Sequence, residues 1–452
     1  MNQQSILTRL DELQARQVKF AVADIDGVLR GKIIDRQKFE KGLQSKFGFC
    51  NVIFGWDLHD QCYDNSKISG WHTGYGDAMA SIDLSSFRQI PWQDQQAFFL
   101  ADFEHANESI AAVCPRSLLK RVRQQCTAMG FRAYFANEFE WFNFKETPQS
   151  LAEKKSIHPH PITPGMFGYS LTRLSQQHTY VDSIFNQLKQ FGIPLEGFHT
   201  ETGPGVYEAA IRYTTVLEAA DRAILFKQGV REIAAQHGIM ASFMAKWHAG
   251  LPGCSGHLHQ SLWDAEGKQN LFGHSGHRYG MSELMEQYVA GQLYCLPHIM
   301  PLFAPTINSY KRYVSGSWAA VSASWGIENR TTALRIINHE TSSTRVETRV
   351  PGADANPYLS MAAALAAGLY GIRHQLKLTT PPTTGNEYEN TGRIPLPTNL
   401  QKATQTMKSS AIAKELLGEV FVDHFVRTRE WEWLQFEQSV TDWELNRYFE
   451  LV

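Results

Sequence analysis

Acidic and imidazole side chains at alternate positions mark one short stretch of this chain. Residues 199–208 have the sequence HTETGPGVYE, in which His199 and Glu201 alternate and Glu208 follows two glycines and a proline. Alternate side chains of an extended strand point to the same face of a sheet. Carboxylates and imidazoles gathered on one face could bind cations, although a surface loop that carries them for solubility is the simpler alternative.

The same alternation recurs in three other strand-like segments. AYFANEFEWFNF, SGHLHQSL and STRVETRVPG each place polar side chains on one face, namely Glu138 and Glu140; His257, His259 and Ser261; and Arg345, Glu347 and Arg349. Any one segment alone is most simply an antiparallel strand with one solvated face. Four together favour convergence around ions or a charged substrate, because such groups are rarely buried without a partner.

Five carboxylates and one imidazole would form an oxygen-dominated ligand set if these segments converge. Such a set suits Mg²⁺ or Mn²⁺ better than zinc, and it is large enough for two ions. Arginines beside it would pair with carboxylate or phosphate oxygens, although each alone is more simply a surface ion pair. The candidate ligands are Glu138, Glu140, Glu201, Glu208, His257 and Glu347, and the candidate arginines are Arg312, Arg330, Arg335, Arg345 and Arg349.

The elements that must position these groups follow from periodicity and from helix-end signals. The first 20 residues are typical of a surface helix, and 20–34 predicts a hairpin around an Asp-Gly turn. Residues 114–130 predict a helix, with proline near the start and glycine at the end. We therefore expect a domain boundary near residue 110. Further helices are predicted at 181–193, at 215–239 and from 358 onward, and a long surface loop at 379–397.

Composition narrows the class of protein. The chain has 452 residues, 43% hydrophobic and 19% charged, with a formal net charge of -2, so nothing favours nucleic acid or an anionic membrane as partner. Six cysteines without a CxxC pair indicate a reducing cytoplasm. The most apolar run, 358–372, is shorter than the roughly 20 residues of a membrane span. Small molecules or copies of the chain itself are the expected partners.

Four blocks resemble the motifs of the glutamine synthetase family, in the family's order. Each block alone is weak, but the combination is specific. The resemblance implies an α+β fold: a β-grasp domain over 1–110 and a glutamine synthetase-type catalytic domain of antiparallel strands and helices over 111–452. It also implies a homo-oligomer of stacked rings, dodecamer-like, with active sites between neighbouring subunits. The blocks are NEFEWF (137–142), HTETGPGVYE (199–208), KWHAGLPGCSGHLHQSL (246–262) and most of 308–372.

The resemblance further implies a reaction in which the γ-phosphoryl group of ATP is transferred to the side-chain carboxylate of glutamate and an amine then displaces phosphate. One metal ion would be bound by Glu140, Glu201 and Glu208, and the other by Glu138, His257 and Glu347. Glutamate would contact Arg312, Arg349, Glu140 and the backbone at Gly253. The phosphates and the nucleotide would face Arg330, Arg335, Arg345, His259, Ser261 and His199.

The chain departs from the family pattern on the amine side. Trp318 stands in the flap where ammonia-using members carry a glutamate, and Lys67 replaces a serine in the loop that keeps Asp64. An aromatic side chain can contact alkyl carbon or stack on a cation. The pattern therefore resembles the γ-glutamyl amide ligases, including γ-glutamylpolyamine synthetases, with Asp64, Trp318, Arg312 and Arg330 as candidate catalytic residues.

Other interpretations stay open. Trp318 could only pack the flap while Asp64 or Glu328 serves ammonia in a true glutamine synthetase. Pro252 stands where the family has asparagine, and the loop 379–397 does not match the family's adenylylated loop. A non-catalytic structural protein of the same fold is a remote alternative, because all six candidate ligands are present. A metal-dependent amidohydrolase or a Cys254 or Ser255 nucleophile lacks the surrounding pattern.

Overall fold

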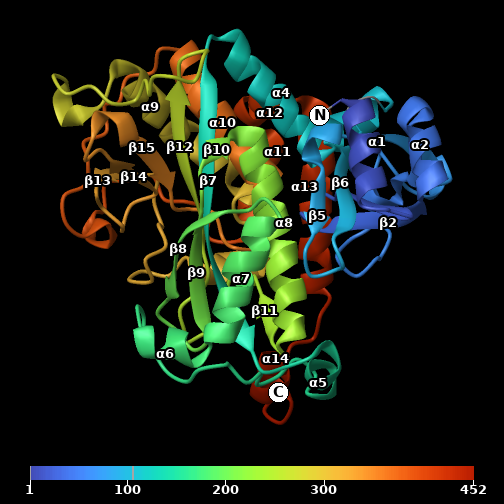
Figure 1. The fold of residues 1–452 in the computed structure, drawn as a ribbon. Helices are drawn as coiled ribbons and strands as arrows, with labels where there is room; N and C mark the ends of the chain where they lie inside the picture. Colours follow the sequence, from blue (N-terminus) through green and yellow to red (C-terminus); the bar gives the residue numbers. More distant parts are fainter. Residues whose placement is uncertain (1, 104–105) are drawn as a thin grey trace.

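The computed structural model describes residues 2–103 and 106–452, and in Figure 1 an N-terminal region packs beside a larger α+β region. Over the described residues, the strands form one six-stranded and one nine-stranded sheet with helices between and around them. The predicted α+β class is confirmed. No helix in the described part of the chain has both the length and the apolar character that crossing a membrane would require.

The N-terminal sheet has the order β2-β1-β6-β4-β3, with β5 paired to β6. Strands β1 and β2 form an antiparallel hairpin, whereas β1 and β6 are parallel. A hairpin followed by a helix and a parallel central pair agrees with the β-grasp arrangement. The strands are β1 (Gln17–Ala23), β2 (Leu29–Asp35), β3 (Phe47–Cys50), β4 (Asp77–Ile82), β5 (Arg88–Ile90) and β6 (Gln96–Asp102), and the helices are α1 (Gln3–Glu12) and α2 (Arg36–Ser45).

The larger sheet has the order β13-β14-β15-β12-β7-β9-β8, with β10 and β11 also paired to β7. Every neighbouring pair is antiparallel except β13 and β14. The strands are β7 (Arg132–Phe144), β8 (Leu195–Thr200), β9 (Val206–Ile211), β10 (Thr214–Thr215), β11 (Met240–Ser242), β12 (Gly256–Trp263), β13 (Trp325–Ile327), β14 (Leu334–Ile337) and β15 (Arg345–Thr348).

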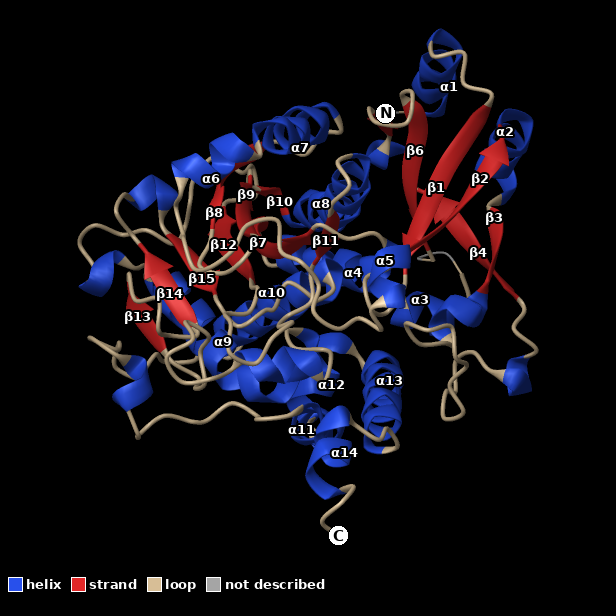
Figure 2. Ribbon diagram, turned by 90° about the horizontal axis from the view of Figure 1, so that it is seen from below, coloured by secondary structure: helices blue, strands red, loops and turns tan. Residues whose placement is uncertain are grey.

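Helices cover this sheet and separate it from the N-terminal region (Figures 1 and 2). The four helices predicted for this part of the chain are all present, as α4, α7, α8 and α10. The helices are α3 (Glu108–Val113), α4 (Pro115–Ala128), α5 (Pro148–Glu153), α6 (Leu171–Gln176), α7 (His178–Gln190), α8 (Val216–Gln236), α9 (Glu283–Ile299), α10 (Pro357–Arg373), α11 (Leu400–Ser409), α12 (Ala411–Leu417), α13 (Glu419–Glu437) and α14 (Asp442–Tyr448).

The boundary expected near residue 110 falls inside α3. Ile110 and Val113 of α3 pack in the core of the N-terminal region, together with Phe99 and Phe103. The larger region contains most of a second, larger core, which also includes Ala21 and Phe98 of the N-terminal sheet and in which α10 is buried along almost its whole length. Its small residues, such as Gly368, allow close packing: a Cβ there would lie 2.0 Å from the ring of Tyr288.

A buried ion cluster joins the two regions. Arg116 of α4 donates from Nη1 to Asp102 at 2.7 Å, from Nη2 to Asp83 at 2.7 Å, and from Nε and Nη2 to the two oxygens of Asp221 at 2.9 and 2.8 Å. The Tyr358 hydroxyl also donates to Asp221, at 2.6 Å. Each nitrogen of the guanidinium therefore has a carboxylate partner. The cluster fixes the N-terminal sheet against α4, α8 and α10.

Candidate active site

The long strand β7, with paired strands on both sides, carries the first acidic pair of the site. Glu138 and Glu140 share one face of β7, whereas Phe139 between them is buried on the other face. Antiparallel pairing places His257 of β12 opposite Glu138, and Glu208 of β9 opposite Glu140. Directly opposed side chains lie on the same face, with Cβ atoms about 5 Å apart. The β7 face therefore collects groups from both neighbouring strands.

These side chains form part of a row of charged groups on one face of the larger sheet, and the row continues from β7 to β8 on one side and to β15 and β14 on the other. His199 of β8 lies opposite Glu208 of β9. On the other side of β7, Glu347 of β15 lies opposite His259 of β12 and Arg335 of β14. Strand register thus gathers on one face side chains that are far apart in the sequence.

A first group of side chains that could bind a cation is formed by His199, Glu201 and Glu208, whose candidate ligand atoms all lie within 4.8 Å of one another. His199 Nε2 is 3.2 Å from Glu201 Oε1 and 3.6 Å from Glu208 Oε1. The Thr202 N–H donates to Glu201 Oε2 at 2.7 Å and orients that carboxylate. The resemblance implied that Glu140, Glu201 and Glu208 bind one ion. In the structure, His199 lies with two of these predicted ligands, Glu201 and Glu208.

A second group is formed by Glu138, His259 and Glu347, again within 4.8 Å. His259 Nε2 is 3.3 Å from Glu138 Oε2. His257 Nδ1 is 3.3 Å from Glu347 Oε1 and 3.7 Å from Glu138 Oε2, and its buried Nε2 has no hydrogen-bond partner among the described residues. Both imidazoles therefore lie close to both carboxylates, and the sequence pattern could not distinguish between them.

The electrostatics of the row fit a divalent cation. Burial, and then the charges of Glu138, Glu140 and Glu201, raise the pKa of Glu208 to about 11. Ionising all four carboxylates together is therefore unfavourable unless a positive charge is added. Carboxylate oxygens with one imidazole per group are a ligand set that Mg²⁺ and Mn²⁺ accept. The residues present are thus suited to hold two such ions.

Two arginines flank Glu347. Arg349 Nη1 donates to Glu347 Oε1 at 2.6 Å, and Arg335 Nη1 donates to Oε2 at 3.0 Å. Burial raises the pKa of Glu347, but Arg349 and then His257 outweigh burial and bring the pKa to about 2. Glu347 is therefore ionised. Arg349 Nε also donates to the backbone carbonyl of Arg330 at 3.1 Å, while the Arg330 side chain is exposed.

Arg312 lies in a buried position beside the row. A Cβ at Gly253 would lie 2.8 Å from Arg312 Cγ, so only glycine lets the arginine stem pass. Arg312 Nη1 donates to Ser255 Oγ at 3.3 Å, and Nη2 donates to the Val350 carbonyl. The Ser255 N–H in turn donates to Glu140 Oε2 at 2.8 Å. Ser255 therefore links two residues predicted to contact glutamate.

A cavity of about 310 Å³ is lined by residues of β7, β9, β12 and β15, and three residues predicted on the nucleotide side, His259, Ser261 and Arg345, are part of this lining. Arg345 Nε lies 3.3 Å from His259 Nδ1. The sequence motifs gave no indication of the aromatic residues that line this cavity, although strand alternation puts Tyr134 on the face of Glu138. These residues are Tyr134, Phe135, Tyr213 and Trp263.

His199 is not among the residues that line this cavity. Instead its ring stacks on Tyr169, with centroids 4.4 Å apart and planes 5° apart. Tyr169 comes from the loop between α5 and α6, and its N–H donates to the Thr200 carbonyl at 2.7 Å. No sequence signal pointed to Tyr169, because that loop has no periodic pattern.

The flap that carries Trp318 follows Arg312. Trp318 is 64% exposed and has a φ of 61°, an uncommon value for a residue with a side chain. Ser317 Oγ donates to the Arg312 carbonyl at 2.9 Å, and the Tyr388 hydroxyl donates to the Ala319 carbonyl at 3.0 Å. Tyr388 belongs to the predicted surface loop 379–397, which therefore holds one end of the flap.

Asp64 lies apart from the other predicted site residues. Its loop packs against α13, where Asn65 Nδ2 donates to the Arg427 carbonyl at 3.0 Å and Lys67 Nζ lies 3.3 Å from Asp423. In Figure 1 the N-terminal region and the larger sheet lie on opposite sides of the helices. Asp64 itself is exposed, and among the described residues no hydrogen bond or ion pair joins it to the row.

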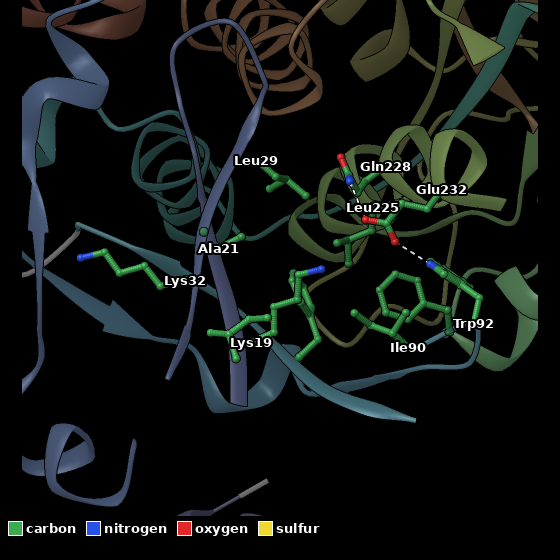
Figure 3. A pocket seen from close by; sticks show the side chains of 13 residues that line it. Lys19, Ala21, Leu29, Lys32, Ile90, Trp92, Leu225, Gln228 and Glu232 are labelled. Carbon is green, nitrogen blue, oxygen red and sulfur yellow. Dashed lines mark hydrogen bonds between the residues drawn. The ribbon is translucent and has the colours of Figure 1, made fainter. Parts of the chain in front are cut away.

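A separate cavity of about 290 Å³ lies between the N-terminal sheet and α8 (Figure 3). Trp92 Nε1 and Gln228 Nε2 donate to the two oxygens of Glu232 there, at 2.5 and 2.6 Å, and Lys19 also lines it. None of the predicted site residues is among its lining. The polar groups that converge on the larger sheet are therefore the candidate functional site.

Comparisons with known proteins agree with this geometry. Residues 112–448 match the family model described as the glutamine synthetase catalytic domain. The chain is 51% identical over 450 residues to type-1 glutamine synthetase 2 of Dictyostelium discoideum. This match covers 99% of this chain and 86% of the relative. It is 35% identical to glutamate–isopropylamine ligase of a Pseudomonas species, over 100% of this chain and 99% of the relative.

Two further matches extend over nearly the whole chain. Gamma-glutamylethanolamide synthetase of Streptomyces coelicolor is 35% identical, over 96% of this chain and 92% of the relative. The solved structure of a GmaS/ADP complex matches with a TM-score of 0.85 at 26% identity, over 98% of both chains. The chain therefore belongs to the glutamine synthetase family and is a ligase that uses ATP to join glutamate to an amine.

Proposed function

We propose that the protein is a γ-glutamyl amide synthetase that couples glutamate to an organic amine, either a small alkylamine or a polyamine. The observation that carries this proposal is Trp318: an exposed indole stands on the flap, and residues 313–323 contain no carboxylate. An indole contacts alkyl carbon and attracts a cation through its ring face, but it cannot accept a proton from ammonium.

The names of two relatives support an organic amine. Proteins 35% identical to this chain over nearly its whole length are named as ligases of isopropylamine and of ethanolamine. Ammonia is the second candidate, because the relative with 51% identity is named a glutamine synthetase. A carboxylate other than the flap glutamate would then have to serve the amine. Asp64 would have to come from another subunit, and Glu328 is already engaged by Arg335 and His339.

The chain's own residues would bind and orient the reactants. Arg312 and Arg349 would hold glutamate, and its γ-carboxylate oxygen would bond to the γ-phosphorus of ATP as ADP leaves. The amine nitrogen would then bond to the carbonyl carbon of this acyl phosphate, whose bond to the phosphate oxygen breaks, so that phosphate and one proton are released. Fixed guanidinium groups suit such a reaction, since phosphoryl transfer depends on positioning and on neutralising oxygen charge.

Two divalent ions and the nucleotide have separate candidate positions in this proposal. The two ions would be bound by the two groups that contain Glu208 and Glu347, and would neutralise phosphate oxygens when bound. The nucleotide would enter the cavity lined by Ser261 and Arg345, with Arg330 and Arg335 toward the phosphates. The charge balance of the carboxylates and the aromatic lining of the cavity support these roles.

We further propose that the protein works as a homo-oligomer of stacked rings in the cytoplasm. Asp64 supports a shared active site, because its exposed loop lies away from the row of its own chain and would serve the row of a neighbour. The six cysteines, all free in the structure, agree with a reducing compartment. Light scattering would measure the assembly, and a monomer with full activity would contradict this arrangement.

The deciding experiment is phosphate release from ATP with glutamate and Mg²⁺, comparing ammonia, methylamine, isopropylamine, ethanolamine, putrescine and spermine, with each product identified by mass. A kcat/KM at least about tenfold higher for one organic amine would support the proposal. A higher value for ammonia would show that the protein is a glutamine synthetase. Turnover with none of these amines would contradict both.

The role of Trp318 is tested by Trp318→Glu. We expect this change to lower kcat/KM for the organic amine about tenfold or more and to raise the relative use of ammonia, because one apolar contact surface is replaced by a proton acceptor. Trp443→Glu is the matched control, since Trp443 is similarly exposed but lies on α14 near the end of the chain. Equal effects of the two changes would contradict a role in amine selection.

A further inference from the structure

Glu328 has an unusual backbone next to the row. It follows directly on β13 and has a φ of 50°, in the left-handed region that costs free energy for a residue with a side chain. Its N–H donates to the Ile336 carbonyl of β14 at 3.0 Å, which fixes the backbone in place. Strain that the surrounding structure maintains is a reason to look for a role of the side chain.

The carboxylate of Glu328 binds Arg335. Its Oε2 accepts hydrogen bonds from Arg335 Nε, at 3.0 Å, and from Nη2, while its Oε1 lies 3.1 Å from His339 Nε2. The remaining nitrogen of Arg335, Nη1, donates to Glu347 Oε2 at 3.0 Å. One guanidinium is therefore shared between two carboxylates, one beside the row and one in it.

The sharing matters because Glu347 is a proposed metal ligand. Glu347 Oε1 already accepts a hydrogen bond from Arg349 Nη1, at 2.6 Å. Without Glu328, the Arg335 guanidinium would have Glu347 as its remaining carboxylate partner and could donate from a second nitrogen to it, closer to a bidentate arginine–carboxylate pair. Glu347 would then bind a cation less well, because this additional hydrogen bond would occupy a lone pair that a cation needs and would bring more positive charge beside the carboxylate. Because two of the three nitrogens of Arg335 donate to Glu328, only the third donates to Glu347.

We propose that Glu328 is a positioning residue, which holds Arg335 away from full pairing with Glu347 so that Glu347 can bind a cation and Arg335 can face phosphate. The inference rests on the ligase activity of the family and on the proposed metal role of Glu347, and does not depend on which amine is used. Among the described residues Glu328 has no hydrogen bond or ion pair with a predicted metal ligand, and it acts through Arg335.

The test measures Mn²⁺ binding to the nucleotide-free full chain by isothermal titration, alongside kcat with the preferred amine. Glu328→Ala should weaken Mn²⁺ binding by about tenfold, since outer contacts to metal ligands commonly change affinity by 10- to 100-fold. Arg335→Ala should bind Mn²⁺ at least as tightly as the unmodified protein. Most importantly, Glu328→Ala in the Arg335→Ala background should change Mn²⁺ affinity less than twofold, because the group it acts through is gone.

An equal weakening in the presence and absence of Arg335 would overturn the proposal, since Glu328 would then act by its charge alone. The control is Glu340→Gln, which removes one charge from an exposed residue with no ion pair among the described residues and should shift affinity less than twofold. If Glu328→Ala fails to fold, Glu328→Gln keeps the shape and one acceptor and should show the same dependence on Arg335. An unchanged Mn²⁺ affinity in both Glu328→Ala and Glu328→Gln would also overturn the proposal. Amine preference should stay unchanged, which separates this result from a failure of the proposed amine.

Discussion

Two buried clusters of charge in this molecule differ in whether their charges are compensated. At the junction of the two regions, every nitrogen of Arg116 meets a carboxylate of Asp83, Asp102 or Asp221. On the face of the larger sheet, Glu208 lies among other carboxylates that raise its pKa to about 11. The charges of the first cluster are compensated within the chain, whereas the carboxylates of the second ionise together only if a positive charge is added.

Structural and functional charge clusters differ in whether their charges find partners within the chain. Both are buried and both combine residues distant in sequence, so burial and residue type alone do not separate them. The two clusters differ in whether every buried charge has a partner of opposite charge within the chain. A cluster with all its partners stabilises the fold, whereas a cluster that lacks a partner can bind a charged ligand. Substitution should therefore affect stability in the first cluster and activity in the second.

The largest effect is expected at the junction. Arg116→Ala leaves several carboxylates buried without their main partner and should lower the free energy of unfolding by about 3–5 kcal/mol. Chemical denaturation followed by circular dichroism measures this loss. Arg9→Ala, which removes an exposed ion pair with Glu12, should leave stability almost unchanged. A loss below about 1 kcal/mol for Arg116→Ala would show that the junction cluster is not a structural one.

The second prediction compares two carboxylate-to-amide changes. Glu208→Gln should reduce kcat/KM by at least about 100-fold through loss of a metal ligand, without loss of stability, because it relieves repulsion with neighbouring carboxylates. Asp221→Asn at the junction should do the reverse and lower the free energy of unfolding. Steady-state kinetics and denaturation of both variants check this. Loss of stability in Glu208→Gln would remove the contrast between the clusters.

Addition of metal should sharpen the contrast. Mn²⁺ at about 100 times its dissociation constant should stabilise the unmodified protein by about 2.7 kcal/mol per site, since it binds the folded state. Thermal unfolding with and without Mn²⁺ measures the shift. We expect a smaller shift for Glu208→Gln and the full shift for Asp221→Asn. A full shift in both variants would place the metal elsewhere.

The smallest predicted effect is a loss of stability at acidic pH that is caused by His424, a residue of α13. His424 is fully buried, neither ring nitrogen has a hydrogen-bond partner among the described residues, and burial followed by Arg429 lowers its pKa to about 4. Below pH 6.5 His424 takes up a proton in the unfolded chain, whereas in the folded chain it stays neutral until the pH falls to about 4. This contribution to stability is therefore complete above pH 6.5 and is lost as pH falls from 6.5 to 4.

Between pH 7 and 5 the loss from His424 should be about 2 kcal/mol. Denaturation at the two pH values measures it in the unmodified protein and in His424→Leu, which cannot titrate at this position. The variant should lose about 2 kcal/mol less than the unmodified protein over this interval. Parallel pH profiles would show that His424 is not kept neutral by burial.

Much of the fold could be predicted from local signals. Helices α4, α7, α8 and α10 were found where periodicity and end signals placed them, because those signals act within a few residues. The boundary expected near residue 110 stays a prediction; residue 110 itself lies in α3, a short helix that packs on the N-terminal core and gives no change in composition. Tyr169 and the Glu328–Arg335 pair went unpredicted because their contacts arise from loops and strand ends.

Which side chains of one strand share a face follows from the amino-acid sequence alone. Alternation in β7 puts Glu138 and Glu140 together whatever the neighbours are, because the period of a strand is fixed by backbone geometry. Only the tertiary structure decided that Glu208 would lie beside Glu140, that His199 would join Glu201, and that Arg335 would be divided between two carboxylates. Strand order and register depend on the packing of the whole core, so no local pattern contains them.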